Sequence, residues 1–228
     1  MEKNNYIVAI DGGAGVGKTS ISKELAKKLN VVYIDTGAMY RAVALYFIQN
    51  RIEISEENIQ KYIDKITVDI AIDSGVNVIN LNGINVTDKI RTEEVSMAAS
   101  KVSKFKKVRE KLVNEQRRLA LNQSVVIEGR DTTTVVFPNA TLKIYLTASI
   151  DVRAKRRYDD LIKENNSFNL SLKEVKQNMI IRDTQDTTRK ESPLSIVKDA
   201  ITVDTSDTNV DGAVEKIISL LKEKINKI

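Results

Sequence analysis

A glycine-rich run near the start of the chain carries residue types that bind phosphate groups. Residues 12–19 read G-G-A-G-V-G-K-T, which is the spacing of the Walker A motif. Glycines allow successive backbone N–H groups to point at one anion, Lys18 can reach the β and γ phosphates, and the Thr19 hydroxyl can ligate Mg²⁺. The run follows an apolar stretch and precedes a predicted helix, whose N-terminal dipole favours the same anion. The sequence therefore predicts a nucleoside triphosphate site made by Gly12, Gly13, Ala14, Gly15, Val16, Gly17, Lys18, Thr19 and Ser20.

Two further polar clusters each follow an apolar run. The first reads D-T-G-A-M-Y-R and ends at Arg41, which is either a solvated charge or a bidentate phosphate ligand. The second reads E-G-R-D and begins at Glu128. Glu128 could order Mg²⁺ or its waters, Arg130 could bind another phosphate, and Asp131 could accept hydrogen bonds from an amino group. A capped turn with a local ion pair is the alternative that the sequence leaves open.

A third group of charges lies on predicted helices further along the chain. Residues 153–157 read R-A-K-R-R, and Arg182, Asp186 and Arg189 follow at helical spacing, so the latter three are expected on one helix face. They predict either a salt-bridge stripe or a mobile lid that closes arginines over a transferring phosphoryl group. Phosphoryl transfer depends on positioning and charge neutralisation, so converging arginines favour an acceptor that is itself a phosphate.

The elements that must position these side chains alternate between short apolar runs and amphipathic stretches. This order predicts an α/β fold with a doubly wound parallel sheet, whose strands are covered on both faces. Ligands of such sheets bind beyond the carboxyl ends of the strands, where the first two clusters fall. The predicted strands are residues 6–10, 31–34, 124–127, 142–146 and 200–203. The predicted helices are residues 18–29, 36–49 with Thr36 as N-cap, 105–122, 150–165, 171–183 and 209–225.

Residues 66–86 interrupt this rhythm. Apolar residues alternate there with a period of two, which predicts half-exposed antiparallel strands. Residues 66, 68, 70 and 72 are expected on one side, continued by Val76 and Val78, with Ile84 and Val86 as possible members. Asp73-Ser74-Gly75 and Asn82-Gly83 are turn signals. The pattern itself leaves open whether this insert is a decoration or part of a site.

Composition narrows the classes of function. The 228 residues contain no cysteine and no histidine, so imidazole chemistry and disulfides are excluded and acid–base work falls to carboxylates. The net charge of +5 suits a polyanionic ligand, but aromatic residues make up only 5%, which argues against a stacking platform for nucleic acid. We find neither a membrane-spanning run nor a signal peptide, and therefore expect a cytoplasmic protein that binds neither membrane nor nucleic acid.

Together these motifs resemble the bacterial cytidylate kinases, members of the nucleoside monophosphate kinase group of P-loop proteins. The resemblance runs in one register from about residue 6 to residue 217. Its motifs, besides the phosphate loop at 11–20, are T-G-A-M-Y-R at 36–41, I-R-T-E-E-V at 90–95, V-R-E at 108–110, E-G-R-D at 128–131, V-V-F-P at 135–138, R-D-x-x-D-x-x-R at 182–189 and S-P-L at 192–194.

The resemblance implies a single P-loop kinase domain over residues 1–228, with a five-stranded sheet. Within it, residues 63–97 would form an antiparallel insert that binds the monophosphate, and residues 153–190 a helical lid. It implies transfer of the γ phosphoryl group of ATP to CMP or dCMP with Mg²⁺, by a cytoplasmic monomer.

The family's site residues carry over to matching positions of this chain. ATP would be held by the phosphate loop together with Arg156 or Arg157, and Mg²⁺ by Thr19 and Glu128. Residues expected to touch the acceptor are Thr36, Arg41, Ser100, Arg109, Arg130, Asp131, Arg182, Asp186 and Arg189. Among these, Ser100, Arg109 and Asp131 would read cytosine, and Arg182 and Asp186 would hold the sugar. Catalytic roles fall to Lys18, Arg130, Arg182 and Arg189.

Three positions depart from the family pattern: Glu128 stands for an aspartate, Thr133 for a glycine and Gly13 for a proline. A kinase acting on UMP or another acceptor remains an alternative, as does a P-loop switch that controls a partner. A switch GTPase would normally carry an N/T-K-x-D motif, which we do not find in the sequence.

Overall fold

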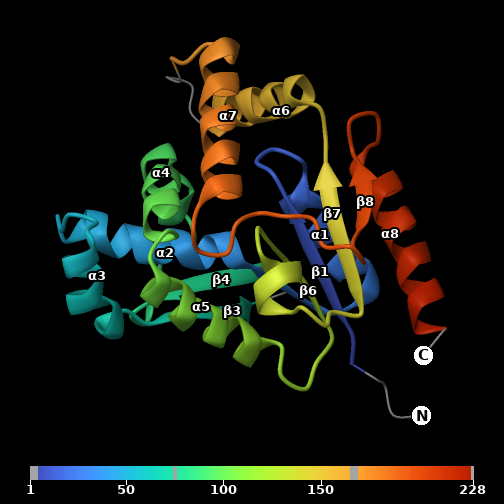
Figure 1. Cartoon of the computed structure of the whole chain (residues 1–228), viewed down its shortest axis with the longest axis horizontal. Coiled ribbons are helices and arrows are strands. Elements are labelled where there is room, and N and C mark those ends of the chain that lie inside the picture. Colours follow the sequence, from blue (N-terminus) through green and yellow to red (C-terminus); the bar gives the residue numbers. More distant parts are fainter. Residues whose placement is uncertain (1–4, 74–75, 165–168, 227–228) are drawn as a thin grey trace.

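The computed structural model describes residues 5–73, 76–164 and 169–226. Its centre is a parallel sheet in the order β2-β6-β1-β7-β8 (Figure 1). The strands are β1 (Ile7–Gly12), β2 (Val32–Asp35), β6 (Val125–Gly129), β7 (Leu142–Thr147) and β8 (Ile201–Asp204). All pairings are parallel, and each strand lies within two residues of its predicted limits. The predicted fold class is therefore confirmed.

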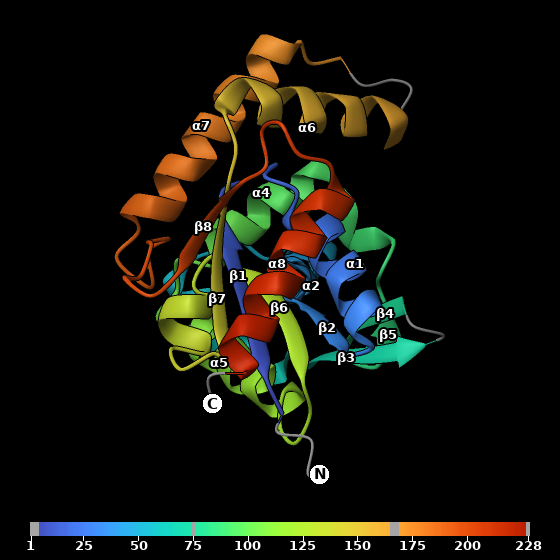
Figure 2. The same ribbon diagram turned by 90° about the vertical axis from the view of Figure 1, so that its right-hand side faces the viewer.

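Helices cover both faces of this sheet. On one face, α1 (Lys18–Leu29) and α8 (Val210–Ile225) pack against alternate residues of the strands, such as Val8 and Ile10 of β1. Figure 2 shows these two helices in front of the sheet. On the other face, Ala9 belongs to a separate apolar cluster with α5 (Lys106–Leu119) and a π-helix at Thr132–Val136. Double coverage explains why residues 7–10 of β1 and 125–127 of β6 are all apolar.

The insert is a three-stranded antiparallel sheet, β3 (Val68–Asp73), β4 (Val76–Leu81) and β5 (Ile84–Asn85). Asn82 and Gly83, with φ of 50° and 79°, make the predicted tight turn between β4 and β5. The turn predicted at 74–75 lies outside the described residues.

The predicted face of β4 was wrong. Ile79 and Leu81 are buried opposite Ile70 and Val68, whereas Val78 pairs with Ala71 on the other face. A shift of one residue at a turn exchanges the two faces of a strand. On the segment that follows, Val86 is buried and Ile84 is exposed.

A second apolar core lies beside the main sheet. It joins α2 (Thr36–Gln49), α3 (Glu56–Tyr62) and α4 (Glu93–Val102) to β3 and β4. Short 3₁₀ turns at Ile63–Lys65 and Lys89–Arg91 flank the strands. Neither α3 nor α4 was predicted from the sequence, although a hydroxyl side chain caps each: Ser55 accepts from the Asn58 N–H, and Thr92 from the Val95 N–H.

The N-cap of α2 also differs from the prediction. Asp35 has extended backbone angles and accepts a hydrogen bond from the Ala38 N–H, so Asp35 and not Thr36 caps this helix. Thr36 is the first helical residue, and its hydroxyl donates instead to the Glu128 backbone oxygen at 2.8 Å. The helix start is thereby tied to the end of the neighbouring strand β6.

Two helices, α6 (Ile150–Glu164) and α7 (Leu172–Thr188), stand at the carboxyl end of the sheet (Figure 1). Ser171 and Glu174 form a capping box at the start of α7. The helix continues past the predicted end at residue 183, and Arg189 lies one residue beyond its last turn. Among the described residues, no helix is both long and apolar enough to cross a membrane.

Candidate active site

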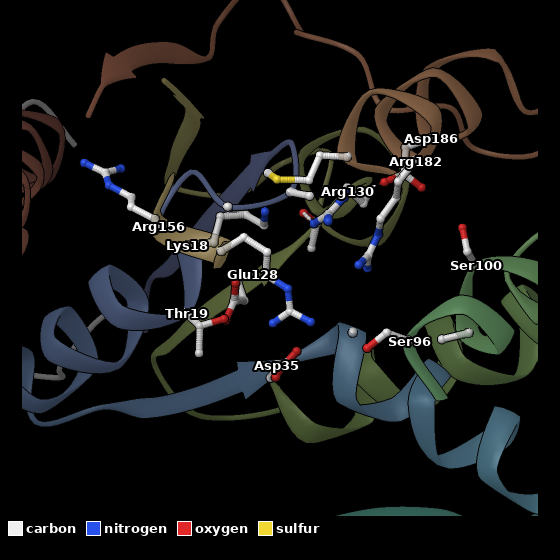
Figure 3. Close-up of a pocket in the computed structure, with 18 of the residues that line it drawn as sticks. Lys18, Thr19, Asp35, Ser96, Ser100, Glu128, Arg130, Arg156, Arg182 and Asp186 are labelled. Carbon is white, nitrogen blue, oxygen red and sulfur yellow. Dashed lines mark hydrogen bonds and ion pairs between the residues drawn. The ribbon is translucent and has the colours of Figure 1, made fainter. Parts of the chain in front are cut away.

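A cavity of about 630 Å³ opens beyond the carboxyl ends of the central strands, between the phosphate loop, α2, α4 and the helix pair α6–α7. In Figure 3, Arg182 and Asp186 reach it from α7, and Ser96 and Ser100 from α4. Most residues predicted from the sequence line it: Ala14, Gly15, Gly17, Lys18, Thr19, Ser20, Thr36, Arg41, Ser100, Arg109, Glu128, Arg130, Asp131, Arg156, Arg157, Arg182, Asp186 and Arg189. Gly12, Gly13 and Val16 are not among its lining residues.

Lys18 is buried at the centre of the phosphate loop. Its Nζ donates to the backbone oxygens of Gly12 at 2.9 Å and Gly13 at 2.6 Å. Burial lowers the pKa of Lys18 to about 7, and the positive charge of Arg130 acts in the same direction. An anion placed beside Lys18 would therefore restore its charge.

Glu128, at the end of β6, faces this lysine from the neighbouring strand. Its carboxylate is buried and accepts hydrogen bonds from the hydroxyls of Tyr33 and Thr19. Burial raises the pKa of Glu128, and the charge of Asp35 raises it further, while Lys18 opposes both. Tyr33 was not identified from the sequence, because it reads there as one residue of an apolar strand.

Thr19 and Glu128 offer the hard oxygen atoms that Mg²⁺ prefers. A cation beside Glu128 would also relieve the repulsion between this carboxylate and Asp35, so the residues fit the ion. Within the described part of the chain, however, no group of three or more acidic side chains could hold a metal. A magnesium ion would therefore need further oxygen atoms, such as those of nucleotide phosphates or water.

Arg41 occupies the wall formed by α2. Its Nη2 donates to Asp35 Oδ2 at 2.9 Å, and the same carboxylate accepts the Ala38 N–H through Oδ1. The Nε of Arg41 is buried with no hydrogen-bond partner among the described residues. The guanidinium therefore keeps donor capacity for a ligand in the cavity.

The predicted charge group of α7 combines ion pairs with an unpaired cation. Asp186 pairs with Arg130 from the β6 loop at 2.8 Å and lies 3.7 Å from Arg189. Burial would raise the pKa of Asp186, but the charges of Arg130 and Arg182 outweigh it and lower this pKa. Arg182 has a buried Nε without a partner in the described structure. Burial and the nearby Arg130 lower the pKa of Arg182 to about 10.

At one end of the cavity, Arg109 and Asp131 form a buried ion pair in which each side chain is 5% exposed. Arg109 also donates to the Ser103 backbone oxygen at 3.0 Å and lies 5.2 Å from the centre of the Tyr40 ring. Burial acts to lower the pKa of Arg109, but Tyr40 and Asp131 together raise it. Ser100, on α4, is within 3.4 Å of Gln185 on α7. The three residues that the resemblance assigns to the base thus line one cavity.

The two lid arginines diverge. Arg156 donates to the backbone oxygen of Thr205 at 2.6 Å, whereas Arg157 donates to Glu93 of α4 at 2.8 Å. Figure 3 shows Arg156 at the opposite end of the cavity from Ser100. Thr205 follows β8, so the rule that ligands bind beyond the carboxyl ends of strands could have identified it.

Lining residues that sequence reasoning missed come mainly from α4, α7 and the segment after β8. They include Tyr40, Glu93, Ser96, Asp160, Asn178, Met179, Thr205, Thr208, Asn209 and Val210. No lining residue comes from β3, β4 or β5 in the described part of the insert. Helix α4, which follows these strands, supplies that wall of the cavity instead.

A phosphate loop on the central strand of a five-stranded parallel sheet, faced by arginines, defines the class of P-loop kinases. The family model described as Cytidylate kinase matches residues 8–223. The chain therefore belongs to the cytidylate kinase family, as the resemblance predicted.

Two individual cytidylate kinases agree with this assignment. A cytidylate kinase of Fusobacterium nucleatum subsp. nucleatum is 42% identical, and the match covers 99% of each chain. One of Caldicellulosiruptor saccharolyticus is 44% identical over 99% of this chain and 98% of its own. Among solved structures, the shikimate kinase from Acinetobacter baumannii is 14% identical and covers 97% of this chain and 95% of its own, with a TM-score of 0.49.

Proposed function

We propose that the chain transfers the γ phosphoryl group of ATP to CMP or dCMP, giving ADP and CDP or dCDP. Membership of the cytidylate kinase family supports this reaction. The structural observation that carries it is the convergence of Lys18 and several arginines from separate elements on one cavity. Such a concentration of positive charge suits two phosphorylated substrates held close together.

ATP would bind along the phosphate loop, with Lys18 at its β and γ phosphates. Arg156 lies toward Thr205, at the end of the cavity away from Ser100, which supports a place for it beside the donor. Thr19 and Glu128 would hold Mg²⁺, which neutralises phosphate charge when bound. Because Glu128 has one methylene more than the usual aspartate, we expect its carboxylate to reach further toward the ion.

The acceptor would occupy the part of the cavity between α2, α4 and α7. Arg41, Arg130 and Arg189 would hold its phosphate, and Thr36 lines the same wall. Arg182 and Asp186 would contact the sugar. Ser100, Arg109 and Asp131 would read the base, with Asp131 accepting from the exocyclic amine of cytosine, which uracil lacks.

The chemistry follows from these charges. An acceptor phosphate oxygen is already ionised at neutral pH, so its in-line attack on the γ phosphorus needs no strong general base. Lys18 and the catalytic arginines Arg130, Arg182 and Arg189 would neutralise the charge that develops on the transferred group. Closure of the lid, residues 153–190, and the insert, residues 63–97, would exclude water and so protect ATP from hydrolysis.

A kinase for another monophosphate is the second candidate, because the arginines bind a phosphate whatever base it carries. The test measures ADP release from Mg–ATP with CMP, dCMP, UMP, AMP and GMP offered separately. Fast turnover restricted to CMP and dCMP is the expected result. Fast turnover with a different monophosphate would retain the kinase and overturn the cytosine assignment, and no stimulation by any of them would overturn the proposal.

We further propose that the active form is a cytoplasmic monomer that binds neither nucleic acid nor membrane.

A further inference from the structure

The backbone of one phosphate-loop residue is held at both of its polar atoms by the lid. Asp183 Oδ1 on α7 accepts a hydrogen bond from the Ala14 N–H at 3.0 Å. Arg153 Nη1 on α6 donates to the Ala14 backbone oxygen at 3.1 Å. Arg153 and Asp183 also form an ion pair with each other. The backbone of Ala14 and the two helices are thus joined in a closed set of contacts.

This pair lies outside the large cavity that we propose as the substrate site. Neither Arg153 nor Asp183 lines the large cavity; both line a second cavity of about 140 Å³, together with Gly13 and Tyr145. Their side chains are 13% and 22% exposed, so solvent screens their interaction less than that of a surface ion pair. Their hydrogen bonds act on the nucleotide site through the loop, and the charge of Asp183 also acts on Arg130.

Gly13 gives the pair its access to the loop. A Cβ at this position would lie 3.1 Å from Arg153 Nη1 and 3.2 Å from each carboxylate oxygen of Asp183. Those contacts are tighter than nearly all Cβ contacts, so both side chains would have to shift by a few tenths of an ångström. The proline that the family usually carries here would stiffen the loop covalently, whereas in this chain the lid contacts supply the restraint.

We infer that Arg153 and Asp183 are positioning residues that fix the shape of the phosphate loop for ATP. A loop whose N–H groups already point correctly loses less conformational entropy when the phosphates bind. The pair also makes this preorganisation depend on the placement of α6 and α7, so the donor site is complete only when the lid lies against the loop. This inference rests on the proposed function only in taking ATP as the ligand of the loop.

The test is the affinity for Mg–ATP in the absence of CMP, measured by titration calorimetry on the full chain. Asp183→Ala removes the acceptor for Ala14 and the partner of Arg153, and should weaken ATP binding roughly tenfold, the effect of one charged hydrogen bond. In turnover assays, KM for ATP should rise to the same extent while KM for CMP changes less than about twofold.

The chain offers a matched control in a second ion pair between the same helices. Lys176 of α7 pairs with Asp151 of α6, and this pair does not touch the loop. Asp151→Ala should leave ATP affinity unchanged. Asp183→Asn keeps an oxygen for the Ala14 N–H and loses the ion pair, so it should fall between wild type and Asp183→Ala. It carries the test if Asp183→Ala does not fold.

Three outcomes would overturn the inference. One is an unchanged ATP affinity in both Asp183 variants. Another is an equal loss of ATP affinity in Asp151→Ala, which would show that the Arg153–Asp183 pair acts only by linking α6 to α7. A third is an equal rise of KM for both substrates. The calorimetric titration contains ATP and no CMP. Its result can therefore be interpreted even if the proposed reaction with CMP fails.

Discussion

The side-chain hydroxyl of Thr133 donates a hydrogen bond to Asp11 at 2.7 Å, and its backbone N–H donates to the same carboxylate at 2.8 Å. Thr132 contributes the equivalent two bonds to the other carboxylate oxygen. Burial raises the pKa of Asp11, and these four donors oppose that rise. The threonine that replaces the family's glycine therefore fastens the π-helix beside Asp131 to the strand that carries the phosphate loop.

We expect Thr133→Val to lower the free energy of unfolding by about 2 kcal/mol, because a buried carboxylate loses one donor. Thr134→Val is the matched control, since the Thr134 hydroxyl makes only a 3.3 Å contact to the Asp131 backbone oxygen. Urea denaturation of the three proteins measures both effects. Equal destabilisation by the two substitutions would show that the hydrogen bond to Asp11 contributes no more to the free energy of unfolding than the weak contact of Thr134.

Lys18 should take up a proton when ATP binds at pH 8. Its pKa of about 7 in the free protein leaves it mostly neutral at that pH, and the triphosphate favours the charged form. The terminal phosphate ionises at about pH 6, so it contributes little to proton exchange at pH 8. ATP affinity should accordingly fall as the pH rises above 7.

Calorimetry in two buffers of different ionisation enthalpy measures this proton uptake. The Lys18→Met variant should bind ATP more weakly, and its binding should take up no proton. Proton uptake that persists in this variant would assign the linkage to another group.

Asp131→Asn should erode discrimination between CMP and UMP by at least about tenfold in kcat/KM, since an amide can also donate to the oxygen of uracil. Arg109 keeps an oxygen partner in this variant, so the loss of stability should stay below the roughly 3–5 kcal/mol of a broken buried pair. A thermal melt serves as the control for folding. An unchanged ratio of kcat/KM in a folded variant would remove Asp131 from base recognition.

Glu93→Gln tests the contact between lid and insert. Arg157 of α6 donates to Glu93 of α4, and both residues line the cavity. The carboxylate is partly exposed, so we expect KM for both substrates to rise by no more than about fivefold. The rise should shrink in high salt, because salt screens the same ion pair in the wild-type chain. A salt-independent difference would point to a packing effect instead.

Several parts of this structure could be predicted because their signals are local. Each strand of the main sheet is a short, mostly apolar run followed by polar residues, and the phosphate loop has a fixed spacing. By contrast, β4 was assigned to the wrong face because a period of two does not define how two antiparallel strands pair, and a register shift of one residue reverses every side chain.

The predicted end of α7 was too early. The last turns of this helix are polar on all sides, so they lack the apolar periodicity by which a helix is recognised in a sequence. Arg41 and Glu128 could be identified as site residues because each belongs to a polar cluster that directly follows a predicted strand. The contacts of Arg153 and Asp183 with the loop were missed, since residues so far apart in sequence leave no joint pattern. Arg156 lies near Thr205 and Arg157 near Glu93 because of where α6 is placed. The spacing of residues in the sequence does not define that placement.

The strand order also decides when the protein can fold during its own synthesis. β1 lies between β6 and β7 in the sheet, and the backbone N–H of Tyr6, just before it, donates to the Ser124 hydroxyl, 118 residues further along. At typical translation speeds, the strand that carries the phosphate loop waits roughly ten seconds on the ribosome before either neighbour emerges. During that interval its apolar residues are a natural target for chaperones, and nucleotide cannot assist folding until most of the chain has been made.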